Sequence, residues 1–101
     1  MTKILTLLGL AKKAGRLAVG TENTIESVRK GKSFLVVASE SVSDGTKKII
    51  SDKTAFYKTQ AVFIPVDTAT FGKAFGRTAT ACVSVNDKGF ADAVRKLLGG
   101  N

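Results

Sequence analysis

The sequence predicts an α/β fold in which a sheet lies between layers of helices. Segments with apolar residues at helical spacing alternate with short apolar runs, and glycines mark many of the joints between them. Continuous apolar runs are typical of strands that are covered on both faces. With 101 residues, 44% of them hydrophobic and one proline, the chain has the composition of a folded globular protein. We therefore expect one domain over residues 1–101.

The first part of the chain predicts two helices and two strands. Apolar residues within 4–11 recur at the spacing of a buried helix stripe, and Gly15 ends that helix. A short extended piece at 17–19 precedes a second helix over about 21–30, and the continuous apolar run at 33–38 predicts a buried strand. The residues of the second helix expected to face inward are Thr24, Ile25 and Val28.

The second part of the chain repeats this alternation. We expect helices over about 46–58, 67–76 and 86–98, and strands over 61–64 and 80–85. Tyr57 and most of the six phenylalanines occupy core-like positions, which argues against an aromatic platform for single-stranded RNA. The apolar residues at helical spacing in these helices are Ile49, Ile50, Phe56, Phe71, Ala74, Phe75, Phe90, Val94, Leu97 and Leu98.

Charge and missing residue types narrow the function. The chain has 16 Lys+Arg against 8 Asp+Glu, a net charge of +8 that favours polyanionic partners. It has no histidine, its only cysteine is Cys82 in an apolar run, and its carboxylates form no close pair. Two near matches to a phosphate loop fail, with Thr21 in place of the lysine and Glu26 in place of the first glycine. We expect no enzyme activity, no metal and no cofactor.

The apolar runs are too short for a membrane span, which needs about 18–20 residues. The apolar N-terminal run leads directly into Lys12 and Lys13 and has no small-residue cleavage site after it. A single cysteine fits a reducing compartment. The sequence thus predicts a cytoplasmic protein without a membrane partner.

The run from residue 19 to 31 gives the most informative indication of a partner. It reads as a glycine turn, a helix start capped by Thr21, one helical stretch and a basic glycine exit. Backbone N–H groups at a helix start suit a phosphate or a base edge. In a basic chain this pattern predicts a nucleic-acid partner. We expect residues 20–32, the loop 39–43 and residues 76–81 to share one RNA-facing surface, with Lys73 and other basic side chains contacting phosphates.

Taken together, these segments resemble the kink-turn-binding ribosomal protein family, the superfamily of large-subunit proteins seven-Ae and thirty-e. The small bacterial YlxQ-type proteins are the branch that the sequence resembles most. The resemblance covers nearly the whole chain and rests on the order and spacing of several segments. These are residues 8–15, 20–31, 35–41, 46–49, 71–76 and 83–85 with the helix that follows.

This resemblance implies a three-layer α/β/α sandwich with a small mixed central sheet. It also implies binding to a kink-turn, a bent RNA helix with tandem sheared G·A pairs. Glu22 and Asn23 fall on base-reading positions, Glu26 falls where the family commonly has lysine, and residues 78–80 match the loop over a flipped-out nucleotide. The RNA-binding residues expected on this basis are Gly20, Thr21, Glu22, Asn23, Glu26, Arg29, Lys30, Lys32, Glu40, Ser41, Arg77, Thr78, Ala79 and Thr80.

The sequence therefore predicts a monomeric, ribosome-associated protein that binds structured RNA, such as a kink-turn in ribosomal RNA. An alternative is a protein-interaction module whose basic surface docks an acidic partner, and Glu26 within the RNA-facing surface favours that alternative. A third, less favoured interpretation is an enzyme that uses a small phosphorylated ligand.

Overall fold

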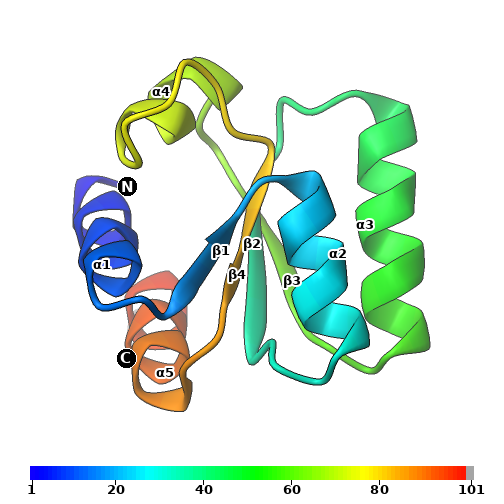
Figure 1. Ribbon diagram of the computed structural model, residues 1–101. Helices are drawn as coiled ribbons and strands as arrows, with labels where there is room; N and C mark the ends of the chain where they lie inside the picture. Colours follow the sequence, from blue (N-terminus) through cyan, green and yellow to red (C-terminus); the bar gives the residue numbers. More distant parts are fainter. Residues whose placement is uncertain (100–101) are drawn as a thin grey trace.

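The computed structural model describes residues 1–99, over which five helices alternate with four strands (Figure 1). This order confirms the α/β prediction. The elements are α1 (Thr2–Lys13), β1 (Leu17–Val19), α2 (Thr21–Arg29), β2 (Leu35–Ser39), α3 (Asp44–Phe56), β3 (Ala61–Ile64), α4 (Thr68–Lys73), β4 (Cys82–Val85) and α5 (Lys88–Gly99).

The sheet is mixed and has the strand order β1-β4-β2-β3. Strand β4 runs antiparallel to both β1 and β2, whereas β2 and β3 are parallel. Val37 of β2 pairs with Val83 on one side and with Val62 on the other. The central strands β2 and β4 are buried along their whole length, as continuous apolar sequences predict.

Helices cover both faces of this sheet. Figure 1 shows α1 and α5 on one face, α2 and α3 on the other, and α4 near one end of the α1 side. Side chains alternate along β2, so Leu35 and Val37 pack with α1, α4 and α5. Val36 and Ala38 point the other way and pack with Val28 of α2 in a smaller core. The three-layer sandwich that the resemblance implied is therefore present.

Cys82 is fully buried in the smaller core. Burial raises the pKa of its thiol above the ordinary 9.0, although the hydroxyls of Thr24 and Thr21 act in the opposite direction. A buried thiol with a raised pKa is a poor nucleophile. The interpretation of Cys82 as an inert core residue agrees with this environment.

The outer surface of α3 differs from the sequence prediction. Ile50 and Thr54 form the buried stripe, and the Thr54 hydroxyl donates to Ile50 O at 2.7 Å. Ile49 and Phe56 lie roughly 100–160° around the helix from the residues of this stripe, because each residue turns an α-helix by ~100°. Their side chains are 49% and 76% exposed. The prediction that core-like spacing buries these residues is wrong, since the sheet covers only one side of α3.

Three aromatic residues also contradict the sequence-based assignment to the core. Phe34, Phe56 and Tyr57 are exposed, whereas Phe71 and Phe75 are buried and pack edge to face. All three exposed residues lie at or next to the ends of their elements. Phe56 is the last residue of α3, Tyr57 follows it, and Phe34 precedes β2. Apolar residues at these places have fewer neighbours than residues in mid-strand.

The inner face of α5 is shorter than predicted. Ala91 and Val94 are buried, but Leu97 and Leu98 of the last turn are exposed. A helix of 12 residues spans ~18 Å. The adjacent strand β4 has four residues and spans only ~13 Å. The last turn of α5 therefore extends past the strand that covers it.

Several boundaries also move by one to three residues. Helix α3 begins at Asp44 because Ser43 caps it, with Ser43 Oγ accepting from Thr46 N at 3.2 Å. Asp67 caps α4, as predicted, and that helix ends at Lys73 rather than near residue 76. Strands β2 and β4 each begin two residues later than the sequence analysis placed them.

Candidate nucleic-acid interface

The ends of β1 and β2 and the start of β4 lie side by side at one edge of the sheet (Figure 1). The topology requires this, because β4 runs antiparallel to both neighbours. Gly20 N donates to Cys82 O at 2.9 Å, and Ser39 N donates to Ala81 O at 2.8 Å. We call this edge the rim and define it as residues 20–23, 39–41 and 78–81.

Helix α2 begins at the rim without a side-chain cap. Gly20 is its N-cap residue, with φ 101° and ψ 159°, and Thr24 N is the amide that bonds back to Gly20 O. The prediction that Thr21 caps this helix is wrong. Thr21 is the first helical residue, and its hydroxyl lies 3.9 Å from Cys82 Sγ. The amides of the first helical turn are thus left for an external acceptor.

Glu22 and Asn23 project from this helix start, and both are exposed. Asn23 Nδ2 donates to Val19 O at 3.1 Å, which holds the amide against the end of β1. This bond leaves the side-chain carbonyl and one N–H of Asn23 for a base edge. The two side chains together present donor and acceptor groups beside the uncapped amides.

The second part of the rim follows β2. Ser39 is buried, and its hydroxyl donates to Val66 O at 2.5 Å and accepts from Ser41 N at 3.1 Å. Glu40 N donates to Ile64 O at 3.0 Å. These bonds fix the backbone of the loop, and the side chains of Glu40 and Ser41 are exposed.

The third part of the rim is packed against α4. A Cβ on Gly72 would lie 2.7 Å from the Ala79 Cα, so this close approach requires glycine. Thr80 N donates to Thr68 O at 2.9 Å, and Arg77 N donates to Gly72 O at 3.0 Å.

Thr78 and Ala79 of this third segment are exposed, and so is Arg77 directly before it. Thr80 is buried, and its hydroxyl has no hydrogen-bond partner among the described residues. Thr80 was predicted to contact RNA, but its side chain does not reach the surface of the rim.

Three basic residues lie away from the rim, at the far end of α2. Arg29 is the last residue of the helix, about 12 Å from Thr21 by helix rise, and Lys30 and Lys32 follow it. The structure therefore divides the predicted residues into a rim group and this far basic group. One face of α2 connects the two groups, since Glu22 and Arg29 line the same hollow.

Glu26 lies between the two groups and pairs with the far basic group. Its carboxylate is 3.1 Å from Lys30 Nζ and 3.8 Å from the Arg29 guanidinium. Lys30, by hydrogen bonding and charge, and then Arg29 lower the pKa of Glu26. Nearby cations thus compensate the negative charge of Glu26.

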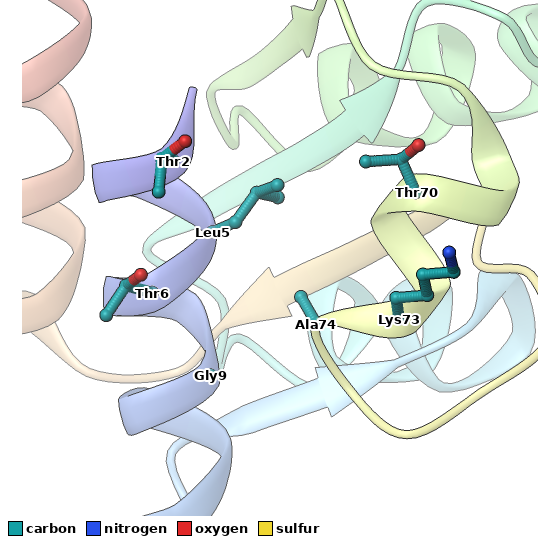
Figure 2. A pocket seen from close by; sticks show the side chains of 7 residues that line it. All are labelled: Thr2, Leu5, Thr6, Gly9, Thr70, Lys73 and Ala74. Carbon is teal, nitrogen blue, oxygen red and sulfur yellow. The ribbon is translucent and has the colours of Figure 1, made fainter.

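A separate cleft of about 450 Å³ lies between α1 and α4 (Figure 2). Figure 2 shows Lys73 beside this cleft, on the α4 side, with Leu5 and Gly9 on the α1 side. The other lining residues are Thr2, Thr6, Thr70 and Ala74, so the cleft holds no carboxylate or thiol for acid–base or nucleophilic chemistry.

Over residues 1–99, no three His, Cys, Asp or Glu side chains are placed to hold a metal ion together. Within the same range, none of the helices combines the length and apolar character that crossing a bilayer requires.

Comparison with known proteins shows which family the chain belongs to. The model of the Ribosomal protein L7Ae/L30e/S12e/Gadd45 family matches residues 2–95. The chain belongs to this family. The resemblance read from the sequence is thereby confirmed over nearly the whole chain.

Two relatives are similar along nearly their full length. The RNA-binding protein YlxQ of Bacillus subtilis is 34% identical over 92 residues, which cover 91% of each chain. The RNA-binding protein YlxQ of Enterococcus faecium is 32% identical over 98 residues, covering 97% of this chain and 93% of the relative.

Solved structures share the fold. A protein of unknown function from Bacillus halodurans superposes with a TM-score of 0.88 at 30% identity, covering 98% of this chain and 99% of that one. The Giardia lamblia 15.5kD RNA binding protein superposes with a TM-score of 0.78 at 17% identity, covering 98% and 84%. The second likeness shows the fold alone.

The family and the names of its relatives support RNA binding. Because this is a family of non-catalytic RNA-binding proteins, they also agree with the prediction that the chain is not an enzyme. Sequence reasoning found the rim segments but missed the role of Gly72, because a close backbone approach leaves no signal in composition or periodicity.

Proposed function

We propose that this protein binds a kink-turn in structured RNA through its rim. The chain acts as a single RNA-binding domain and as a monomer, in the cytoplasm, on RNA associated with the ribosome. Its contribution is recognition of a bent RNA shape, without catalysis.

The uncapped start of α2 is the observation that carries this proposal. Its first amides and the Asn23 side chain lie at the rim, where Gly20 bonds to the start of β4, which in turn bonds to Ser39 at the end of β2. A kink-turn widens an RNA groove at its sheared G·A pairs, and such a groove admits a helix terminus. Amide donors aimed outward suit base-edge acceptors and phosphates.

The rim and the far basic group contact different parts of the RNA. Glu22 and Asn23 contact base edges, whereas Arg29, Lys30, Lys32 and Arg77 contact phosphates. Glu40, Ser41 and the backbone of residues 78–80 flank a nucleotide that leaves the stack. The Thr80 side chain is buried, so we assign only the backbone of Thr80 to this contact.

The alternative function, docking of an acidic protein on the basic surface, drew its support from Glu26. That support weakens because Glu26 pairs with Lys30 and Arg29 on its own helix. An RNA strand passing α2 then meets a locally compensated group rather than an isolated negative charge. We therefore retain RNA as the partner.

Titration of a kink-turn RNA and of a straight duplex of equal length, each at two salt concentrations, tests the proposal. We expect tighter binding to the kink-turn at both salt concentrations. If four cations contact phosphates, the logarithm of the binding constant should fall with the logarithm of salt with a slope of about −3 to −4. Equal and weak binding to both RNAs would contradict the proposal.

A further inference from the structure

An exposed aromatic pair lies at the end of α3, outside the rim. Phe56 is 76% exposed, and its ring packs edge to face with that of Tyr57 at 4.9 Å between centroids. Tyr57 is itself 37% exposed. Large aromatic side chains that are neither buried nor covered commonly mark a contact surface. The proposed recognition of the kink-turn does not use this pair.

The surface around the pair is hollowed and continues toward α2. Phe56, Tyr57, Ile49 and Lys53 line a hollow of about 490 Å³. Ile49 also lines a neighbouring hollow of about 410 Å³, together with residues of α2 that include Arg29. Ile49 therefore joins the aromatic pair to the face of α2 that carries the far basic group.

Positive charge without a carboxylate partner flanks the pair. Lys53 and Lys58 are exposed, and neither forms an ion pair within the described residues. Asp52, the acidic residue of the hollow, pairs with Lys48 at 3.6 Å. The local charge therefore favours an anionic occupant.

The positive charge disfavours a second copy of the chain as the occupant and favours single-stranded nucleic acid. A second copy of the chain would bring another +8 charge onto the same basic surface. Single-stranded nucleic acid suits exposed aromatic rings flanked by cations, because its bases stack on the rings while its phosphates meet the cations. A ring as exposed as Phe56 leaves one face open for such stacking.

We propose that an unpaired nucleotide of single-stranded RNA stacks on Phe56, beside Tyr57, with its phosphates held by Lys53 and Lys58. This inference rests on the proposed function in one respect, since the strand is taken to continue from RNA bound at the rim. Helix α3 begins next to the rim and reaches Phe56 after 12 further residues, or ~18 Å. The strand that leaves a bound kink-turn has to cross this distance.

The protein contains an intrinsic fluorescent probe for this contact. Tyr57 is the only tyrosine and there is no tryptophan, so intrinsic emission reports on this residue alone. We would titrate the protein with a blunt kink-turn RNA and with the same RNA carrying a single-stranded uridine extension of about 8 nucleotides. Free N-acetyltyrosinamide in the same titration corrects for absorption by RNA. We expect the extension to quench Tyr57 and to tighten binding.

Phe56→Ala separates stacking from general charge attraction. Its side chain is largely exposed, so the fold should tolerate the change. Loss of one stacked base corresponds to a decrease of about 5- to 150-fold in the affinity gained from the extension. Leu10→Ala, which removes an exposed apolar side chain from α1 in the opposite layer, should leave that gain unchanged.

The outcomes distinguish this inference from the proposed function. If the blunt kink-turn binds but the extension neither quenches Tyr57 nor adds affinity, the aromatic pair is not an RNA site, and a protein partner becomes the occupant to seek. If the kink-turn fails to bind, titration with the uridine strand alone tests the aromatic site. Quenching that Phe56→Ala weakens supports the site without the rim, whereas the absence of quenching overturns it.

Discussion

Gly20 sets the geometry of the rim, because its backbone occupies a region that other residues avoid. With φ 101° and ψ 159°, it turns the chain from β1 into α2 and leaves the first amides of the helix uncapped. Asn23 then bonds back to Val19 and anchors the helix start to the strand. At the residue scale, the proposed RNA recognition depends on these two local arrangements.

Gly20→Ala should destabilise the protein through strain alone. A Cβ at this position meets nothing within 4 Å, so no clash is created. The backbone conformation should lower the free energy of unfolding by about 1–3 kcal/mol, measured by urea denaturation. The control is Gly45→Ala in α3, which has equally open space and no positive φ, and which should be neutral or stabilising. Equal stability of the two variants would contradict the strain.

Asn23→Ala should weaken binding to a kink-turn RNA more than binding to a straight duplex. The substitution removes a group for base edges but no charge, so attraction to phosphates persists. Gln60→Ala serves as the control, because it removes an exposed amide directly before β3, away from the rim, that also makes one hydrogen bond, accepted from Arg95 Nε at 2.7 Å. Equal losses on both RNAs would mean that Asn23 does not read bases.

Glu26→Gln should increase affinity for RNA at low salt. The change frees Lys30 and Arg29 from their carboxylate partner, so both become available to phosphates. Because more counterions are then released, the salt dependence of binding should also become steeper. An unchanged affinity and slope would place the RNA away from this face of α2.

At the scale of elements, α4 supports the third part of the rim. Gly72 lets the backbone of residues 78–80 pack directly on this helix, with the Ala79 atoms 2.7–2.9 Å from the position of a Cβ. Backbone rather than a flexible side chain occupies that space. The loop therefore cannot keep its place if residue 72 gains a side chain.

Gly72→Ala should displace this loop and weaken binding of the kink-turn. Overpacking against backbone typically costs about 1–3 kcal/mol of stability, so the variant is to be assayed below its unfolding temperature. Amide shifts in NMR spectra should concentrate at residues 77–80. A variant with normal shifts there and normal RNA affinity would show that α4 does not position the loop.

The order and type of the elements could be predicted from sequence. How much of each element is buried by the neighbouring layers could not. The continuous apolar run of β2 specifies a strand that is buried on both faces, whatever its neighbours are. Helical spacing in α3 specifies only that one stripe is buried. Whether Ile49 and Phe56 are covered depends on the layer beyond the helix, which no local pattern describes.

The candidate site was predictable to a similar extent. The run at residues 20–31 indicated a helix start with a polar tip, but it did not indicate that Gly20 rather than Thr21 would cap it. The meeting of three distant segments depends on β4 running antiparallel between β1 and β2. Pairing of this kind is a property of the sheet, and it is not contained in any one segment.

At the scale of the whole molecule, titration should affect stability only at the extremes of pH. Nearby donors lower the pKa values of three exposed carboxylates: Lys30 acts on Glu26, Lys88 acts on Asp92, and the amide of Thr70 acts on Asp67. A lowered folded-state pKa means that the unfolded chain binds more protons. Stability from these groups is present above their ordinary values of 4.5 and 3.8 and is lost as pH falls through the lower folded values.

At alkaline pH, the change of stability with pH has the opposite sign. Burial raises the pKa of Cys82, so above the ordinary value of 9.0 only the unfolded chain loses this proton, and stability falls as pH rises. With no histidine, the free energy of unfolding should be flat between about pH 5 and 8. Urea denaturation across this range checks the prediction, and a transition near pH 6.5 would contradict it.

The central claim is that RNA binds at the rim, and NMR of the labelled protein during titration with a kink-turn RNA tests it most directly. We predict that the largest amide shifts fall on residues 20–23, 39–41 and 78–80, with smaller shifts in the far basic group. The amides of α1 and α5, on the opposite face of the sheet, should stay in place. Shifts that concentrate on α1 and α5, while the rim remains unchanged, would contradict the account.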